Sequence, residues 1–228
     1  MSQNRPRSAA AGILLLLLLG CLVMACVDAL GNQPYIVKSA IKAMLFLVLP
    51  ILFSALHKDL SVRNLFHIER RGIWPSLLAG GIVFCVILGG YALLRPWLDL
   101  SRVTAMLATE NIDRTTYPFV AIYIAVCNSF MEEFFFRGFS FLTLRRFLPS
   151  SCASIASASA FALYHIAIVI GWFPLPLFLF IISALFITGV VFNALDARYG
   201  STFPSWMLHM CANLAINAIG LFLFYAPA

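Results

Sequence analysis

Seven long apolar stretches recur along this 228-residue chain, and they limit its fold more than any other feature. A helix rises about 1.5 Å per residue, so about 20 residues are needed to cross the hydrocarbon core of a bilayer. Inside lipid the backbone has to satisfy its own hydrogen bonds, which favours helices over irregular chain. The stretches cover residues 11–30, 37–56, 73–94, 117–142, 153–172, 174–195 and 204–225. We therefore predict an all-α polytopic membrane protein with about seven transmembrane helices in a single domain, residues 1–228.

The composition agrees with this prediction and argues against other classes of protein. Hydrophobic residues make up 62% of the chain and charged residues 11%, whereas a soluble domain carries about 25% charged residues. The net charge is +6, but the basic residues do not form a stripe with interleaved aromatic residues, so we expect no nucleic-acid surface. The six cysteines are scattered without a CxxC pair, which argues against a disulfide framework and against a thiolate metal site.

The N-terminal stretch has two interpretations. Its basic residues and leucine run, RPRSAAAGILLLLLLGC, resemble a signal peptide, and LLGC resembles a lipoprotein cleavage box. The apolar stretch continues to Leu30, however, and is therefore long enough to span a bilayer. We expect a retained first transmembrane helix.

Lysine and arginine in the short loops set the expected orientation, because cytoplasmic loops are enriched in both residues. If the helices alternate in direction, most basic loop residues fall on the side of the N-terminus. They are Arg5, Arg7, Lys58, Arg63, Arg70, Arg71, Arg145, Arg146 and Arg198. We therefore expect a cytoplasmic N-terminus and an external C-terminus. We also expect an amphipathic helix along the cytoplasmic interface over residues 59–74.

A few polar residues fall deep inside the predicted helices. A charged group at mid-bilayer costs at least about 2.5–3.5 kcal/mol by insertion scales, so ionisable residues there are candidates for function. They are Glu132, Glu133, Arg137, His165 and His209, joined by the uncharged Asn128, Asn213 and Asn217. Asp28, Lys38 and Lys42 also fall within predicted helices but near their ends. We expect these three to reach the membrane interface by snorkelling.

The spacing of the two adjacent glutamates suggests different tasks for them. Glu133 and Arg137 are four residues apart, so they share a helix face and are expected to form an ion pair. Glu132 points about 100° away from Glu133 and cannot share that partner easily. We expect Glu133 to be neutralised and held by Arg137, and Glu132 to be left to act as a base.

Two later helices each add polar residues at the same four-residue spacing. The sequence FALYH places Phe161 and His165 on one helix face, and HMCAN does the same for His209 and Asn213. Three helices would then present polar groups to one intramembrane cavity. A carboxylate, two imidazoles and an amide are the groups needed to activate a water molecule and to stabilise an oxyanion.

The three motifs together resemble those of the CPBP family of intramembrane proteases, named for CAAX proteases and bacteriocin-processing enzymes. EEFFFR fits the pattern EExxxR, FALYH fits FxxxH and HMCAN fits HxxxN, in that order within about residues 117–217. The resemblance implies catalytic helices around a polar cavity open to peptide, and endoproteolysis by a glutamate-activated water. It implies that Glu132 is the general base beside His165, and that His209 and Asn213 stabilise the oxyanion. It also implies that Glu133 and Arg137 organise the site. The compact chain is similar to bacterial members, which implies the bacterial cytoplasmic (inner) membrane.

Several alternatives stay open at the level of sequence. Glu132, His165 and His209 also have the donor chemistry for a zinc ion, but HExxH is absent, and we favour a reaction without metal or cofactor. A proton-coupled transporter would use similar residues, although no repeat symmetry is visible. The same fold would also serve as an immunity or scaffolding protein without proteolysis. The expected partner of the protease is a membrane-tethered peptide or protein, which the sequence does not name, and the oligomeric state stays open.

Overall fold

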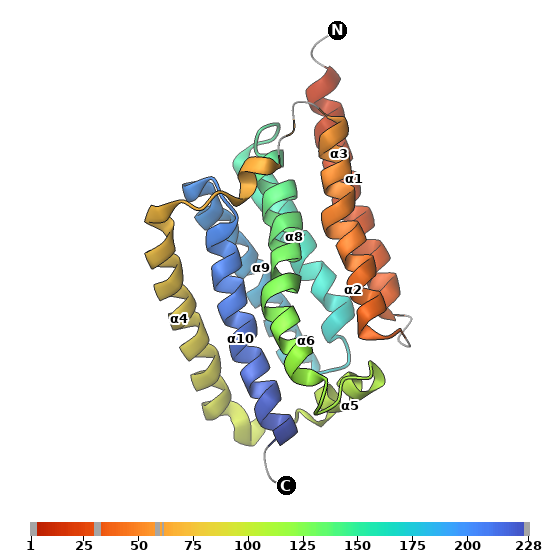
Figure 1. Cartoon of the computed structure of the whole chain (residues 1–228), viewed down its shortest axis with the longest axis vertical. Helices are drawn as coiled ribbons and strands as arrows, with labels where there is room; N and C mark the ends of the chain where they lie inside the picture. Colours follow the sequence, from red (N-terminus) through yellow and green to blue (C-terminus); the bar gives the residue numbers. More distant parts are fainter. Residues whose placement is uncertain (1–3, 30–32, 58–59, 61, 226–228) are drawn as a thin grey trace.

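The computed structural model describes residues 4–29, 33–57, 60 and 62–225, and within these ranges it is a helical bundle without a strand (Figure 1). Among the described residues, seven helices are long and apolar enough to cross a membrane, so the predicted number of spans is confirmed. The spans consist of α1 (Asn4–Ala29); α2, η1 and α3 (Tyr35–Ala43, Met44–Val48 and Leu49–Leu56); α4 (Arg70–Leu94); α6, η4, α7 and η5 (Tyr117–Tyr123, Ile124–Asn128, Ser129–Glu133 and Phe134–Leu142); α8 (Ser150–Val169); α9 (Leu175–Tyr199); and α10 (Phe203–Tyr225).

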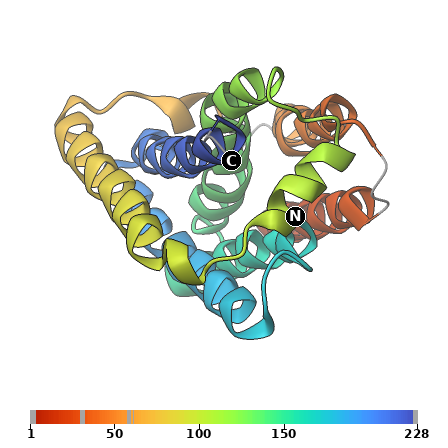
Figure 2. The ribbon, with the colours of Figure 1, turned by 90° about the horizontal axis from the view of Figure 1, so that it is seen from below.

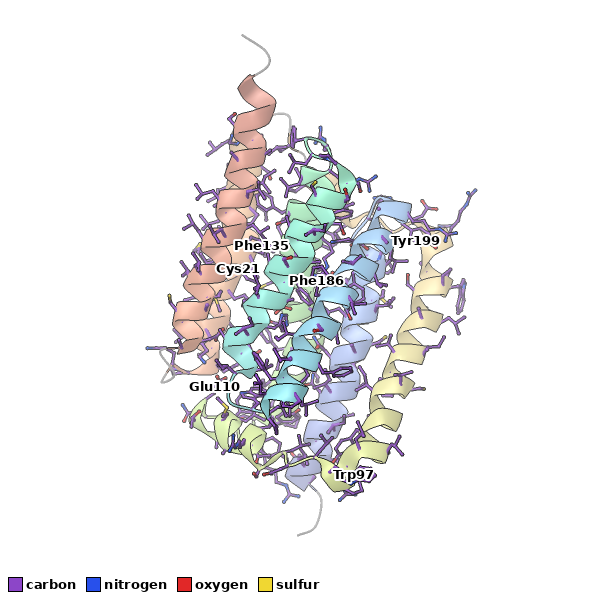
Figure 3. All side chains as sticks on the ribbon, turned by 180° about the vertical axis from the view of Figure 1, so that it is seen from behind. Cys21, Trp97, Glu110, Phe135, Phe186 and Tyr199 are labelled. Atoms are coloured by element: carbon purple, nitrogen blue, oxygen red, sulfur yellow. The ribbon has the colours of Figure 1, made fainter. Side chains whose placement is uncertain are left out.

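The fourth span, from α6 to η5, is the central helix of the bundle. The buried share of its most apolar window is 56%, against 6–33% in the other spans. Phe135 of this span stacks on Phe46 of η1 with ring centroids 4.2 Å apart, and Phe136 meets Phe161 of α8 edge to face. Figure 3 shows Phe135 and Cys21 of α1 near the middle of the bundle. The phenylalanines that follow the two glutamates therefore pack in the core and do not face lipid.

Two segments of the fourth span, η4 and η5, are π-helical, and η1 in the second span is π-helical as well. Such widened turns are frequent at functional sites. Three side chains of α10 donate hydrogen bonds to carbonyl groups in and beside η4. They are Trp206 to Val126 at 3.1 Å, Asn213 to Ile124 at 3.2 Å and Asn217 to Ala121 at 2.8 Å. Because backbone oxygens in lipid need donors from the protein, these bonds stabilise the irregular span and hold α10 against it.

A short helix, α5 (Ser101–Thr109), lies in the connection between α4 and the fourth span. It lies at the end of the bundle opposite the N-terminus and runs across that end, as the view from below shows (Figure 2). The labelled Glu110, which caps the C-terminal end of α5, lies near the adjoining end of α1 (Figure 3). The outer helix α4 packs mainly on α10. The connection therefore places α5 over the side of the bundle formed by α1, α2 and α8.

The predicted amphipathic helix over residues 59–74 is wrong. The described part of this segment contains only one 3₁₀ turn, η2 (Arg63–Phe66), before α4 begins at Arg70. The reason is that its carbonyl groups are bound by the turn between α9 and α10. Thr202 donates to the carbonyl of Leu65 from its backbone nitrogen at 2.8 Å and from its hydroxyl at 3.0 Å. Ser201 donates to the carbonyl of His67 at 2.7 Å. These bonds fix an extended path that a helix cannot follow.

Candidate active site

A cavity of about 310 Å³, lined by both polar and apolar residues, lies inside the bundle. The residues that carry its chemistry come from α2, η4, α7, α8 and α10. Six of them are Lys42, Asn128, Glu132, Tyr164, His165 and His209. The cavity extends from these residues toward α5, whose Met106 and Leu107 also line it. Residues from five separate helical segments are therefore brought to one volume, as the sequence predicted for its three motifs.

Glu133 lies behind the cavity and is fully buried, with no exposed surface. Its Oε2 atom lies 3.2 Å from Nε of Arg137, so the predicted ion pair is present. The guanidinium group of Arg137 is also fully buried and lies 4.0 Å from the ring centroid of Phe161. A charge that is removed from water needs such partners, because desolvation costs several kcal/mol for each ion. The pair therefore forms a fixed structural base for the motif.

The second oxygen of Glu133 has a partner that the sequence did not predict. Nδ1 of His209 lies 2.7 Å from Oε1 of Glu133, at hydrogen-bond distance. Because a carboxylate only accepts, Nδ1 of His209 carries the hydrogen. In the neutral imidazole, Nε2 of His209 is then an acceptor, and it faces the cavity beside Glu132. Glu133 thus orients a histidine as well as binding an arginine.

His165 is oriented in a similar way by the backbone of its own helix. Its Nδ1 atom lies 2.7 Å from the carbonyl oxygen of Phe161, one turn earlier on α8. A carbonyl oxygen only accepts, so Nδ1 carries the hydrogen here too, and the neutral ring presents an acceptor at Nε2. The position of Phe161 in the FxxxH motif thus supplies both a ring against Arg137 and a carbonyl for His165.

Glu132 is buried, with 2% of its surface exposed, and one of its oxygens faces both histidines. Its Oε2 atom lies 3.9 Å from Nε2 of His165 and 3.9 Å from Nε2 of His209. These separations are too long for direct hydrogen bonds. They are suited to a bridging water, whose two O–H groups need acceptors. The site can therefore hold a water molecule against a carboxylate, which is what general-base chemistry requires.

The other oxygen of Glu132 is held by two residues to which the sequence analysis assigned no role in the site. Oε1 lies 3.1 Å from Nζ of Lys42 and 3.0 Å from Nδ2 of Asn128. Lys42 also donates to Oδ1 of Asn128 at 2.7 Å. The prediction that Lys42 snorkels to the interface is wrong, because its ammonium group is turned inward to Glu132. A usable signal was present in the sequence: Lys38 and Lys42 are four residues apart and lie on one face of an apolar helix.

Lys38 lies nearer the end of the cavity that α5 covers. Its Nζ atom lies 2.6 Å from Oε1 of Glu110 and 3.6 Å from Oδ1 of Asp28. The ion pairs among these three residues connect α1, α2 and the C-terminal end of α5. They line the cavity together with the catalytic candidates, so the polar interior continues to this end of the bundle.

Asn213 lines the cavity one turn from His209, and its Nδ2 atom donates to the carbonyl of Ile124 at 3.2 Å. That bond uses one of its two amide hydrogens. Asn217 donates in the same way to the carbonyl of Ala121. The two asparagines therefore both fix α10 on the fourth span, and Asn213 alone of the two also faces the cavity.

The suitability of the site for a metal ion follows from its donor atoms. Glu132, His165 and His209 have suitable chemistry for zinc. Within the described ranges, however, no three histidine, cysteine, aspartate or glutamate side chains form a group that could hold a metal ion. In addition, the Lys42 ammonium lies 3.1 Å from Glu132 and would repel a divalent cation beside the same carboxylate. The residues present therefore do not make a zinc site in this arrangement.

Comparison with known proteins adds one match. Residues 114–215 match the family described as type II CAAX prenyl endopeptidase Rce1-like. No curated protein and no solved structure matches the chain. The matched segment contains the three motifs, from Glu132 to Asn213, and leaves α1 to α5 outside it.

Proposed function

Because residues 114–215 make this chain a member of the CPBP/CAAX protease family, we propose that it is a glutamate-dependent intramembrane endopeptidase. Its substrate is a peptide or protein that is itself associated with the membrane. The observation that carries the proposal is that Oε2 of Glu132 lies 3.9 Å from Nε2 of His165 and 3.9 Å from Nε2 of His209. This arrangement suits a water molecule that is about to be deprotonated.

In the first step, the water oxygen attacks the carbonyl carbon of the scissile peptide bond. Glu132 takes the proton at Oε2, while Nε2 of His165 accepts a hydrogen bond from the water and so fixes its orientation. The product of this step is a tetrahedral intermediate that carries a negative oxygen. Burial of Glu132 excludes bulk water from its carboxylate, which strengthens each of these electrostatic interactions.

In the second step, Glu132 returns the proton to the nitrogen of the leaving group. The carbon–nitrogen bond breaks, which gives a carboxylic acid and an amine, so one water molecule is consumed for each bond. Asn213 has one amide hydrogen left for the oxyanion. His209 donates from Nε2 only after that nitrogen has taken up a proton, because Nδ1 stays bound to Glu133. The role that the family motif implies for His209 therefore requires its imidazolium form.

The distribution of lysine and arginine supports a cytoplasmic N-terminus. On that topology α5 and the cavity end that it covers face the outer side of the membrane. The substrate peptide would then reach Glu132 from that side or laterally from the bilayer. Labelling single cysteines introduced at exposed Arg102 of α5 and at Arg145 with a membrane-impermeant maleimide tests the orientation. Reaction of the Arg145 position alone in intact cells contradicts this topology.

The central test compares the wild-type protein with Glu132→Gln, both purified in detergent, on a panel of membrane-tethered peptides. Gln keeps the shape of the side chain and removes the base, so we expect its kcat to fall by at least about 10²-fold. Equal cleavage by the two proteins contradicts the proposal. Absence of cleavage by either protein, together with ion flux in liposomes, supports a transporter instead.

A chelator added to the same assay tests the alternative metal-dependent reaction. We expect activity to be unchanged by chelation, because the proposed base acts on water directly. Loss of activity that zinc restores would show that Glu132, His165 and His209 hold a metal ion in the active enzyme.

A further inference from the structure

Lys42 is the cationic side chain in direct contact with the proposed general base, and no motif of the family includes it. It belongs to α2, outside the matched residues 114–215, and lies 90 positions before Glu132 in the chain. Its side chain is 12% exposed and lines the cavity. A lysine in this position costs free energy unless its charge is used or paired.

An ammonium group has three N–H donors. One of those of Lys42 bonds Oδ1 of Asn128 at 2.7 Å, and a second bonds Oε1 of Glu132 at 3.1 Å. The ring of Tyr164 also lies close, with its centroid 5.2 Å from Nζ. One N–H group of Lys42 is thus left for the interior of the cavity, next to the carboxylate that activates the water.

The other polar groups around this position have few hydrogen-bond donors left for a ligand. Asn213 uses one amide hydrogen on the carbonyl of Ile124, and the neutral forms of His165 and His209 present acceptors to the cavity. A developing oxyanion needs preorganised donors, and a charged donor in a site that excludes water is worth more than a neutral one. Lys42 is the side chain that meets this need without a change of protonation.

We propose that Lys42 is a catalytic residue of this protease, which holds Glu132 through Oε1 and donates its third N–H to the carbonyl oxygen of the scissile bond. The inference rests on the proposed function and adds a helix outside the family motifs to the active site. The covalent step is unchanged: the water oxygen bonds to the carbonyl carbon, and Glu132 takes the proton. The negative charge that forms on the carbonyl oxygen is then balanced by the ammonium of Lys42.

The test uses a peptide that the wild-type protein cleaves, and the variants Lys42→Met and Lys42→Arg. We expect Lys42→Met to lower kcat by about 10²–10³-fold, the usual effect of losing one oxyanion donor, with KM within about threefold. Lys42→Arg should restore part of this loss. Lys38→Met is the comparator, since Lys38 lies one turn away on the same helix but pairs with Glu110. The effect of Lys38→Met should appear mainly as a change in KM. A kcat for Lys42→Met within about threefold of wild type overturns the inference.

A second measurement separates catalysis from structure. The scissile bond of the same peptide is replaced by a phosphinate, whose tetrahedral anion mimics the transition state. Lys42→Met should bind the phosphinate about 10²-fold more weakly than wild type does. The affinity of the unmodified peptide, measured in the Glu132→Gln background, should change little. An equal loss of affinity for both ligands would show that Lys42 only shapes the cavity, and would overturn the inference.

The contact with Glu132 can also be measured without any substrate. Melting temperatures in detergent are compared for Lys42→Met, Glu132→Gln and the double variant. Because the two side chains share a hydrogen bond, the double variant should lose less than the sum of the single losses. If the losses in melting temperature are additive, the inference is overturned even if no peptide is cleaved. The wild-type protein could fail to cleave any peptide while the melting temperatures still show coupling between Lys42 and Glu132. That result counts against the proposed function and not against the contact between the two side chains.

Discussion

Nδ1 of His209 lies 2.7 Å from Oε1 of Glu133, which links the first and last motifs of the site directly. Glu133 therefore has two partners from two helices, because Arg137 binds its other oxygen at 3.2 Å. This relationship explains why the two glutamates are adjacent in sequence. Glu133 faces the packed interior and fixes a histidine, while Glu132, one residue earlier, is turned into the cavity.

Replacing Glu133 with glutamine should destabilise the protein strongly. The substitution removes the negative charge that pairs with Arg137, and breaking a buried ion pair from one side costs about 3–5 kcal/mol. Unfolding in detergent, followed by denaturant or heat, measures the loss. The double variant Glu133→Gln/Arg137→Met is the control, since it leaves no unpaired buried charge and should recover part of the stability. A single variant as stable as wild type would show that the pair contributes nothing.

His209 should tolerate asparagine structurally but not catalytically. The asparagine amide lies about where Nδ1 does, so it can still donate to Glu133, whereas nothing replaces Nε2 near Glu132. We expect His209→Asn to keep a stability within about 1 kcal/mol of wild type and to lose about 10²-fold in kcat. His209→Ala, which lacks both groups, should lose stability and activity together. Full activity of His209→Asn would show that Nε2 takes no part in the reaction.

The spans and the intrahelical ion pair follow from local patterns in the sequence. Apolar stretches of bilayer length predict helices whatever their neighbours are, and the fourth predicted stretch has the same bounds as the observed span, Tyr117–Leu142. The pairing of Glu133 with Arg137 needs only four-residue spacing on one helix. Both features depend on residues that are close in the chain.

The contacts that complete the site depend on packing between distant segments. Lys42 meets Glu132 across 90 positions, and His209 meets Glu133 across 76. Lys42 was expected at the interface because it falls near the end of a predicted helix, and hydropathy does not specify which residue of α7 it meets. The π-helical segments η4 and η5 add a further difficulty, because they change the angular positions that a regular period of 3.6 residues assigns.

Asp113 should make the connection between α5 and α6 sensitive to acid. Its Oδ1 atom accepts hydrogen bonds from the hydroxyl of Thr115 at 2.7 Å and from the backbone nitrogen of Thr116 at 2.9 Å. These hydrogen bonds lower the pKa of Asp113 from 3.8 to about 2, and the bond from the Thr115 hydroxyl has the largest effect. A lowered pKa in the folded state means that the carboxylate stabilises the fold above about pH 4, and that this contribution is lost as the pH falls toward 2.

Replacing Asp113 with alanine should therefore flatten the dependence of melting temperature on pH between about 4 and 2. The variant should already be less stable than wild type at neutral pH, because the turn before α6 loses its acceptor. The measurement is a series of thermal melts in detergent at fixed ionic strength. If wild type and Asp113→Ala lose stability in parallel across this range, other carboxyl groups account for the acid sensitivity.

Gly220 of α10 should not accept even one methyl group. A Cβ atom there would overlap the hydroxyl of Tyr117, which donates to the carbonyl of Asn217 at 3.3 Å. Gly220→Ala should therefore displace Tyr117 and cost about 1–3 kcal/mol, the usual effect of overpacking. Gly81→Ala is a matched control on α4, since a Cβ atom there meets nothing within 4 Å. Alanine in an open helical position is about 0.5–1 kcal/mol better than glycine, so this control should be neutral or stabilising.

The same pair of variants tests whether the C-terminal half of α10 affects catalysis. Gly220 lies nearly two turns beyond Asn213, and Tyr117 does not line the cavity. We therefore expect Gly220→Ala to keep a kcat within about threefold of wild type in the temperature range where it stays folded. A large loss of kcat would mean that the bonds from Asn213 and Asn217 to the fourth span transmit the displacement of Tyr117 to Glu132. In that case the donors of α10 set the geometry of the active site and do not merely stabilise the bundle.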